Sequence, residues 1–226
     1  YEVTMTRIEF FNAVKKKRLE QLSLEELAYA HLSDSNFTET NHGLLTSSLS
    51  TVLREIRHVK WQTYGNSFLP LSAAFTVLDQ LGYCYENAEL TKFGNQNASS
   101  IKKSLYYFCG FAENDTDTQT LVALRNSFLH TASGLSKAQY PNQPNHRFVF
   151  DPEANDLITY PAQEWDGSFS TLTNAHTTYV NQKKLIAMVE AAVDKARGLL
   201  YDNKLVVSLP EGCPEFYYRF LKHHEQ

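Results

Sequence analysis

Residues 116–133 read TDTQTLVALRNSFLHTAS, and this stretch has the periodicity of one amphipathic helix. Its apolar residues recur at steps of three and four, and together with Leu135 just downstream they form one stripe: Leu121, Leu124, Phe128, Ala132 and Leu135. Asp115, Thr116 and Asp117 offer N-cap oxygens at one end, and Gly134 is a typical residue for the other. We therefore expect a helix that begins near Thr116, ends before Gly134 and packs its apolar stripe on a core.

Three polar residues of this helix, Arg125, Asn126 and His130, lie away from the apolar stripe. At about 100° per residue, Arg125 falls about 60° to one side of the stripe, whereas Asn126 and His130 fall nearly opposite it. They place a guanidinium, an amide and an imidazole within about 7.5 Å along one helix axis. Groups of this kind can cleave a phosphodiester without a metal, so the three residues are candidate catalytic residues.

The spacing of arginine and histidine is weak on its own, because Arg219 and His224 repeat it near the C-terminus. The segment upstream supports the catalytic interpretation of these residues. Residues 68–82 read FLPLSAAFTVLDQLG, a long apolar helix that ends in a Leu-Asp-x-Leu-Gly turn. Followed by a shorter helix and then an Arg-Asn-x3-His helix, it resembles the HEPN superfamily (higher eukaryote and prokaryote nucleotide-binding domain), over residues 44–135.

The resemblance implies a helical bundle that pairs with a second copy of itself. Many HEPN proteins are metal-independent endoribonucleases in which the Arg-polar-x3–5-His helices meet across the homodimer. On this sequence the motif positions are Arg125, Asn126 and His130, and Asp79 is a candidate for an acidic residue that orients the arginine. The substrate implied is single-stranded RNA. Roles in phage defence or a toxin–antitoxin system also fit, with an antitoxin or regulatory protein as a further partner.

The same residues allow a non-enzymatic interpretation. Arg125 could pair with Asp79, Asn126 could bond a backbone carbonyl and His130 could close the helix end. The chain would then be a non-catalytic HEPN-like dimerisation or partner-binding module. A structural cluster should be dry and fully paired, whereas a catalytic site should leave Arg125 and His130 accessible from a cleft at a two-fold interface.

Charge and hydropathy limit the class of protein. The net charge of −4 argues against a large duplex footprint but allows a narrow cleft on single-stranded RNA. The basic run at residues 15–18 (KKKR) is either a solvated helix face or an RNA-steering patch. No run approaches the roughly 18 apolar residues of a transmembrane helix, so we expect no membrane partner.

Metal and cofactor sites have no support in the sequence. Neither glycine-rich phosphate-binding motif is present, and the histidines are scattered without paired ligands. The three cysteines, Cys84, Cys109 and Cys213, are far apart and have no metal-ligand spacing. We expect them to be reduced, mostly buried thiols of a cytoplasmic protein that needs no cofactor and no metal.

The whole chain predicts one mainly α domain over residues 1–226, with a helical core at about 4–135 and a C-terminal extension at about 140–226. Helices are expected at 4–21 (with Ile8, Phe11 and Val14 facing inward), after a capping box at Ser23, and at 44–61, 68–82, 99–110 and 172–201. Loops are expected at 34–42, 86–98 and 140–145. In the extension, 147–150 and 157–160 predict a β-hairpin, which 204–209 could join as a third strand. Residues 223–224 are expected to lie in a disordered terminus.

Overall fold

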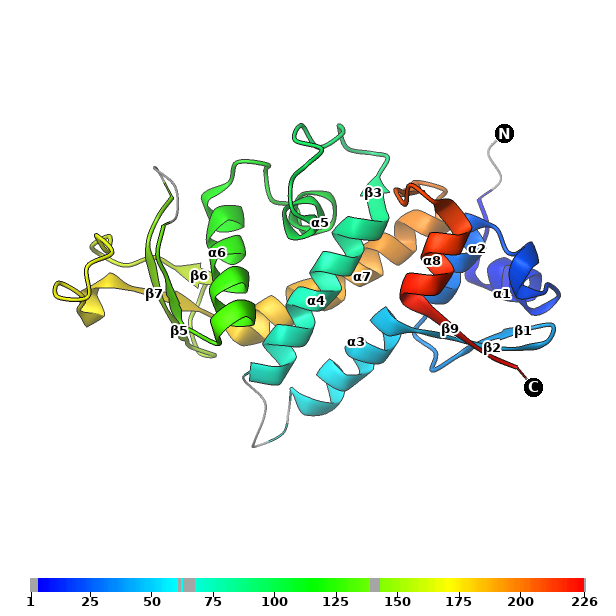
Figure 1. The fold of residues 1–226 in the computed structure, drawn as a ribbon, viewed down its shortest axis with the longest axis horizontal. Coiled ribbons are helices and arrows are strands. Elements are labelled where there is room, and N and C mark those ends of the chain that lie inside the picture. The colour runs from blue at the N-terminus through cyan, green and yellow to red at the C-terminus, as the bar shows by residue number, and fades with distance from the viewer. Residues whose placement is uncertain (1–3, 61, 63–67, 139–142, 226) are drawn as a thin grey trace.

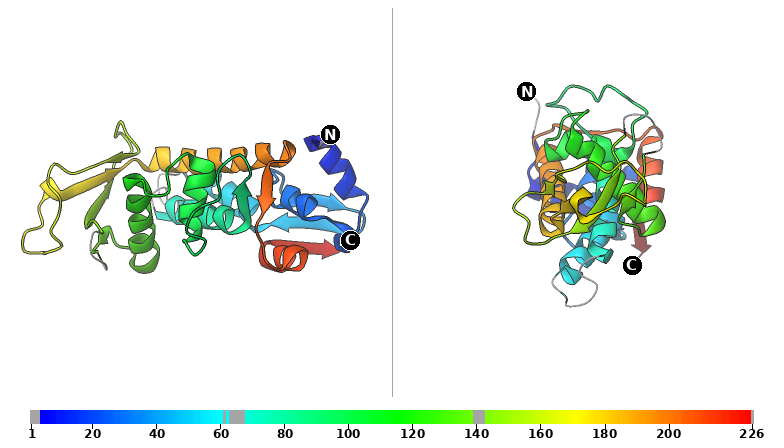
Figure 2. Two further views of the ribbon diagram at one scale, coloured as in Figure 1. Left: turned by 90° about the horizontal axis from the view of Figure 1, so that it is seen from above. Right: turned by 90° about the vertical axis from the view of Figure 1, so that its left-hand side faces the viewer.

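The computed structural model describes residues 4–60, 62, 68–138 and 143–225. These residues form a helix-rich mixed α/β protein with eight α-helices and three small sheets. Figure 1 shows an elongated molecule with α4 and α7 in the middle and a sheet at either end of the long axis, an arrangement that Figure 2 confirms from above. The helices are α1 (Arg7–Lys15), α2 (Leu24–His31), α3 (Ser48–Val59), α4 (Phe68–Cys84), α5 (Ser100–Cys109), α6 (Thr116–Thr131), α7 (Gln182–Tyr201) and α8 (Gly212–Phe220).

Helix α4 is the centre of the core and packs against α3, α5 and α7. Its inner face is fully buried and includes Leu71, Phe75 and Leu78. The predicted turn at Gly82 is wrong, because α4 continues to Cys84. Gly82 serves a different purpose: a Cβ there would lie 1.8 Å from the backbone oxygen of Ser100, so its absence lets α5 cross α4 closely.

Helix α6 begins as the sequence predicts and ends earlier. The side chain of Asp115 caps it by accepting a hydrogen bond from the backbone N–H of Asp117. The helix stops at Thr131, because Ala132 adopts a left-handed conformation with φ 51°. The predicted stripe is therefore buried only in its first three members (Leu121, Leu124 and Phe128), while Ala132 is exposed and Leu135 begins a strand.

The N-terminal helix is shorter than predicted. Helix α1 ends at Lys15, and a 3-10 helix (Leu19–Gln21) follows it. Phe10 and Val14 are the buried residues of α1, whereas Ile8 is 71% exposed, so the predicted inward face is wrong for Ile8 and for the exposed Phe11. The face is rotated because Phe10 stacks on Tyr29 of α2, with ring centroids 5.4 Å apart. Ser23 and Glu26 form the expected capping box of α2.

One sheet joins the two ends of the chain. Strand β2 (Gly43–Ser47) lies between β1 (Thr38–Thr40) and β9 (Leu221–Glu225), and both pairings are antiparallel. Three predictions are corrected here: residues 34–42 are not all loop, the helix predicted at 44–61 begins at Ser48, and residues 223–224 lie in a strand. Position 61, the predicted end of that helix, lies outside the described residues.

The predicted β-hairpin is wrong in its pairing. Strand β7 (Thr177–Val180) lies between the two predicted hairpin strands, parallel to β5 (His146–Phe150) and antiparallel to β6 (Ile158–Thr159). Strand β4 (Leu135–Ser136) completes the sheet beside β5. The helix predicted from 172 therefore begins only at Gln182, after the 3-10 helix Asn174–His176, β7 and the N-cap Asn181. Positions 140–142 of the loop predicted at 140–145 lie outside the described residues.

The C-terminal part of the chain lies in the core rather than beside it. Strand β8 (Leu205–Val207) pairs with β3 (Tyr85–Asn87), not with the predicted hairpin. Helix α7 buries Leu185, Val189 and Ala196 in the same hydrophobic cluster as α4 and α5. No helix in the described part of the chain is long and apolar enough to cross a membrane.

Candidate functional site

An ion pair between Asp79 and Arg125 joins α4 to α6. Arg125 donates from Nε and from Nη2 to the same carboxylate oxygen, Asp79 Oδ2, at 3.1 and 2.7 Å. The two side chains are 26% and 27% exposed, so the pair is neither buried nor fully solvated. Burial of Leu124 and Phe128 fixes the rotation of α6 and so directs Arg125 toward α4.

Asn126 is attached to the same pair. Its side-chain oxygen accepts a hydrogen bond of 3.0 Å from Arg125 Nη1. All three guanidinium nitrogens of Arg125 therefore have a partner within the chain. Because Asn126 Oδ1 is occupied in this way, its amide N–H groups remain the donors that an incoming ligand would meet.

Arg125 and Asp79 line an open groove of about 420 Å³ between α4, α6 and α8. The groove also contains a second guanidinium, that of Arg219 on α8. Arg219 Nε lies 3.0 Å from Glu215 Oε1, and its guanidinium carbon lies 5.3 Å from the centre of the Tyr83 ring. The groove thus presents two arginines, each held by a carboxylate, beside an aromatic ring.

A chain of hydrogen bonds leads from the wall of the groove into the core. Gln80 lines the groove, and its Oε1 accepts from Ser48 Oγ at 2.9 Å and lies 3.3 Å from His31 Nε2. His31 Nδ1 lies 2.8 Å from the hydroxyl of Tyr85. Burial lowers the pKa of His31 to about 4, so the ring is neutral at pH 7 and orients Gln80 rather than transferring protons.

His130 lies elsewhere on α6. It is exposed in the last turn, as expected, and among the described residues no hydrogen bond, ion pair or ring contact involves it. Arg125 faces α4, and His130, five residues on, points about 140° away around the helix axis. One chain therefore brings together Arg125, Asn126 and Asp79 but leaves His130 apart from them.

Arg219 was missed as a groove residue because its sequence pattern points elsewhere. Arg219 and His224 share the motif spacing, but α8 ends at Phe220 and His224 lies on strand β9. There its Nε2 lies 3.2 Å from Thr46 Oγ1. The second match to the motif is thus not a second site, although its arginine lines the first one.

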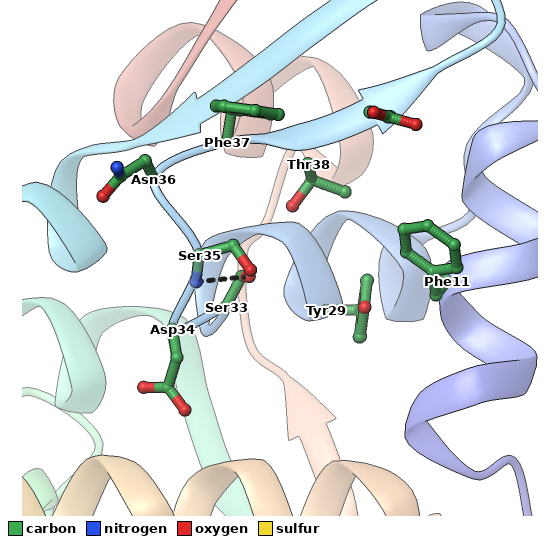
Figure 3. Close-up of a pocket in the computed structure, with 9 residues that line it drawn as sticks. Phe11, Tyr29, Ser33, Asp34, Ser35, Asn36, Phe37 and Thr38 are labelled. Carbon is green, nitrogen blue, oxygen red and sulfur yellow. Dashed lines mark hydrogen bonds between the residues drawn. The ribbon is translucent and has the colours of Figure 1, made fainter.

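A separate hollow of about 460 Å³ lies beside α1 and β1 (Figure 3). The aromatic rings of Phe11, Tyr29 and Phe37 surround it, together with the polar residues 33–36. Asp34 on its rim is already paired with Arg197, at 2.8 Å. None of the motif residues contributes to this hollow.

The basic run at residues 15–18 is partly neutralised. Lys15 pairs with Glu39, and Lys17 lies 2.7 Å from the buried Glu26. The three cysteines are free, and burial raises the pKa of the Cys109 thiol to about 12. In the part of the chain that the structure describes, no three His, Cys, Asp or Glu side chains converge to hold a metal ion.

Comparison with known proteins gives no relative. No family model matches the chain, and no curated protein or solved structure matches it significantly. The resemblance to the HEPN superfamily therefore stays a prediction that depends on the motif residues and their order along the chain.

Proposed function

We propose that this protein is a metal-independent endoribonuclease of the HEPN type that cleaves single-stranded RNA. The observation that carries the proposal is the position of Arg125, held by Asp79 at the wall of an open groove. Asn126 and His130 follow it on the exposed side of the same helix. A fixed, partly exposed guanidinium is suited to bind a phosphate, because its N–H groups match the phosphate oxygens.

The reaction uses the ribose 2′-hydroxyl as nucleophile. As the 2′-oxygen forms its bond to phosphorus, the bond from phosphorus to the 5′-oxygen breaks, and the products are a 2′,3′-cyclic phosphate and a 5′-hydroxyl. His130 accepts the proton of the 2′-hydroxyl or supplies the proton of the leaving 5′-oxygen. Arg125 and the Asn126 amide stabilise the charge on the non-bridging oxygens. DNA, which lacks the 2′-hydroxyl, is not cleaved.

The proposal includes a homodimer. Arg125 and His130 point to different sides of α6, so the histidine that faces a given Arg125 would come from a second copy. The outer side of α6 suits such a contact, because Ala123 and Ser127 are small and allow a neighbouring helix to approach. In a two-fold arrangement two histidines can divide the roles of general base and general acid.

One observation favours the alternative of a non-catalytic dimerisation or partner-binding module. Each guanidinium nitrogen of Arg125 already has a partner, which is what a structural cluster requires. The partial exposure of the pair and the isolation of His130 are better explained by a site that binds a ligand.

Cleavage of a labelled single-stranded RNA in the presence of EDTA tests the proposal. We expect the wild-type protein to form a cyclic-phosphate product and the variants His130→Ala and Arg125→Ala to lose it. Matched controls are His42→Ala, on the exposed turn between β1 and β2, and Arg54→Gln, on the exposed side of α3. Unchanged cleavage by the His130 or Arg125 variant contradicts the proposed mechanism. No cleavage by the wild type favours the binding module.

A further inference from the structure

A second groove, of about 400 Å³, lies on the other side of Asn126. It is formed by α5, α6 and the residues around the end of β4, and its polar lining includes Lys102, Gln119, Asn126, Ser136 and Lys137. Asn126 therefore connects two hollows, since it lines this groove and accepts the hydrogen bond of Arg125, which lines the first one.

The charge of this second groove is not balanced. Among the residues that the structure describes, two lysines line it and no aspartate or glutamate does. Within the described residues, neither Lys102 nor Lys137 has a carboxylate within 4.0 Å, whereas Arg125 and Arg219 in the first groove are both paired. In a chain of net charge −4, two lysines without a carboxylate partner around one hollow favour the binding of an anion there.

The two lysines differ in their surroundings. Lys102 is half-buried on α5, and Lys137 Nζ lies 5.2 Å from the centre of the Phe169 ring. The neighbouring Lys103 is different, because its Nζ donates to the backbone oxygen of Gln96 at 2.8 Å. Only Lys102 of this adjacent pair is available to a ligand in the second groove.

The neutral residues supply the hydrogen bonds that a phosphate backbone uses. The amides of Gln119 and Asn126 and the hydroxyl of Ser136 all offer donors to phosphate and sugar oxygens. Gln119 and Asn126 are about 10 Å apart along the axis of α6, and His130 lies about 6 Å further on. The groove thus follows α6 toward the motif residues.

We propose that the groove lined by Lys102 and Lys137 binds the backbone phosphates of single-stranded RNA that flank the scissile phosphate. The inference rests on the proposed function in taking RNA as the ligand. Lysines at flanking phosphates position the strand without reading its bases, so this groove contributes affinity and register, and Arg125, Asn126 and His130 carry out the reaction.

The test is binding of a short fluorescent oligouridylate whose 2′-hydroxyls are methylated, so that it cannot be cleaved. The test variant is Lys102→Gln with Lys137→Gln, and the matched control is Lys92→Gln with Lys103→Gln, which removes the same charge from another hollow. Loss of two phosphate contacts lowers the affinity about 20-fold at about 0.1 M salt and reduces the slope of log K against log salt by about 1.4. The control variant binds like the wild type.

Binding and cleavage separate this inference from the proposed function. Weaker binding by the test variant alone supports the groove, even where the wild type does not cleave RNA and the proposed function fails. Equal affinity of test variant and wild type overturns the groove, and so does equal loss in the test and control variants. Failure of the wild type to bind the oligonucleotide also overturns it. Thermal unfolding of each variant verifies that the fold is intact.

Discussion

Replacing Asp79 with asparagine removes the negative charge that holds Arg125 and keeps the shape of the side chain. The carboxylate accepts two hydrogen bonds from the guanidinium, at 3.1 and 2.7 Å, and both side chains are about one quarter exposed. Hydrogen bonds to charged groups contribute about 1.5–3 kcal/mol in protected sites, and exposed ion pairs about 0.2–1 kcal/mol. Between these limits, we expect a coupling free energy of about 1.5 kcal/mol for this pair.

A double-mutant cycle measures that coupling. The free energy of unfolding in urea is determined for the wild type, Asp79→Asn, Arg125→Gln and the double variant. The single variants should each lower the melting temperature by roughly 3–6 °C, and the double variant should lose less than the sum of the two. The control cycle is the exposed pair of Lys183 and Glu153, whose side chains are 58% and 80% exposed, with an expected coupling below about 0.5 kcal/mol.

A coupling for Asp79 and Arg125 no larger than that of the control pair would refute the reasoning. It would mean that the ion pair does not hold the guanidinium in place, and that Arg125 is oriented by other contacts. An RNA cleavage assay tests the role of the ion pair independently of stability. If Asp79 positions Arg125, Asp79→Asn should reduce kcat/KM for RNA without abolishing cleavage, whereas Arg125→Ala should abolish it.

Two further predictions follow from the packing and the buried histidines. Gly82→Ala should destabilise the protein by about 3 kcal/mol, because its Cβ would collide with the backbone of Ser100. Gly198→Ala should stabilise it by about 0.5–1 kcal/mol, because apart from its own helix backbone and chain neighbours no atom lies within 4 Å of the new Cβ. Equal urea midpoints for the two variants would contradict this. Burial lowers the pKa of His31 and of His146 to about 4, so between about pH 6.5 and 4 the unfolded chain binds more protons and stability falls as the pH falls. Between pH 7 and pH 5, each histidine should lower the free energy of unfolding by about 2 kcal/mol. The free energy of unfolding of His31→Gln should therefore depend less on pH over that range. An unchanged pH dependence would show that His31 is not buried in its neutral form.

Local sequence signals account for the helices around the candidate site. The side chain of Asp115 forms the N-terminal cap of α6, and the periodicity of Leu121, Leu124 and Phe128 sets its buried face, both within a few residues. Because these signals act over one or two helical turns, they can be recognised from the sequence alone. The same reasoning placed Arg125 beside the stripe, where Asp79 could reach it.

The sheets could not be predicted in the same way. Strand β9 pairs with β2 from the opposite end of the chain, and β7 separates the two strands that looked like a hairpin. These strands have at most five residues, so they carry little periodicity of their own. The early end of α6 at Ala132 has a related cause, since Gly134 is needed close to the backbone of Phe148 in β5.

The sequence by itself determined where the helices α4, α5 and α6 begin and which residues form the motif, although the ends of α4 and α6 differ from those predicted. Helix periodicity and capping depend on neighbours in the chain, which is why these features could be recognised. Only the tertiary structure decided what surrounds the motif. Arg219 enters the first groove from α8, and Lys102 and Lys137 form the second, from elements that the sequence keeps far apart. Convergence of this kind depends on how helices and strands cross, which is set by the packing of the whole core rather than by any local pattern.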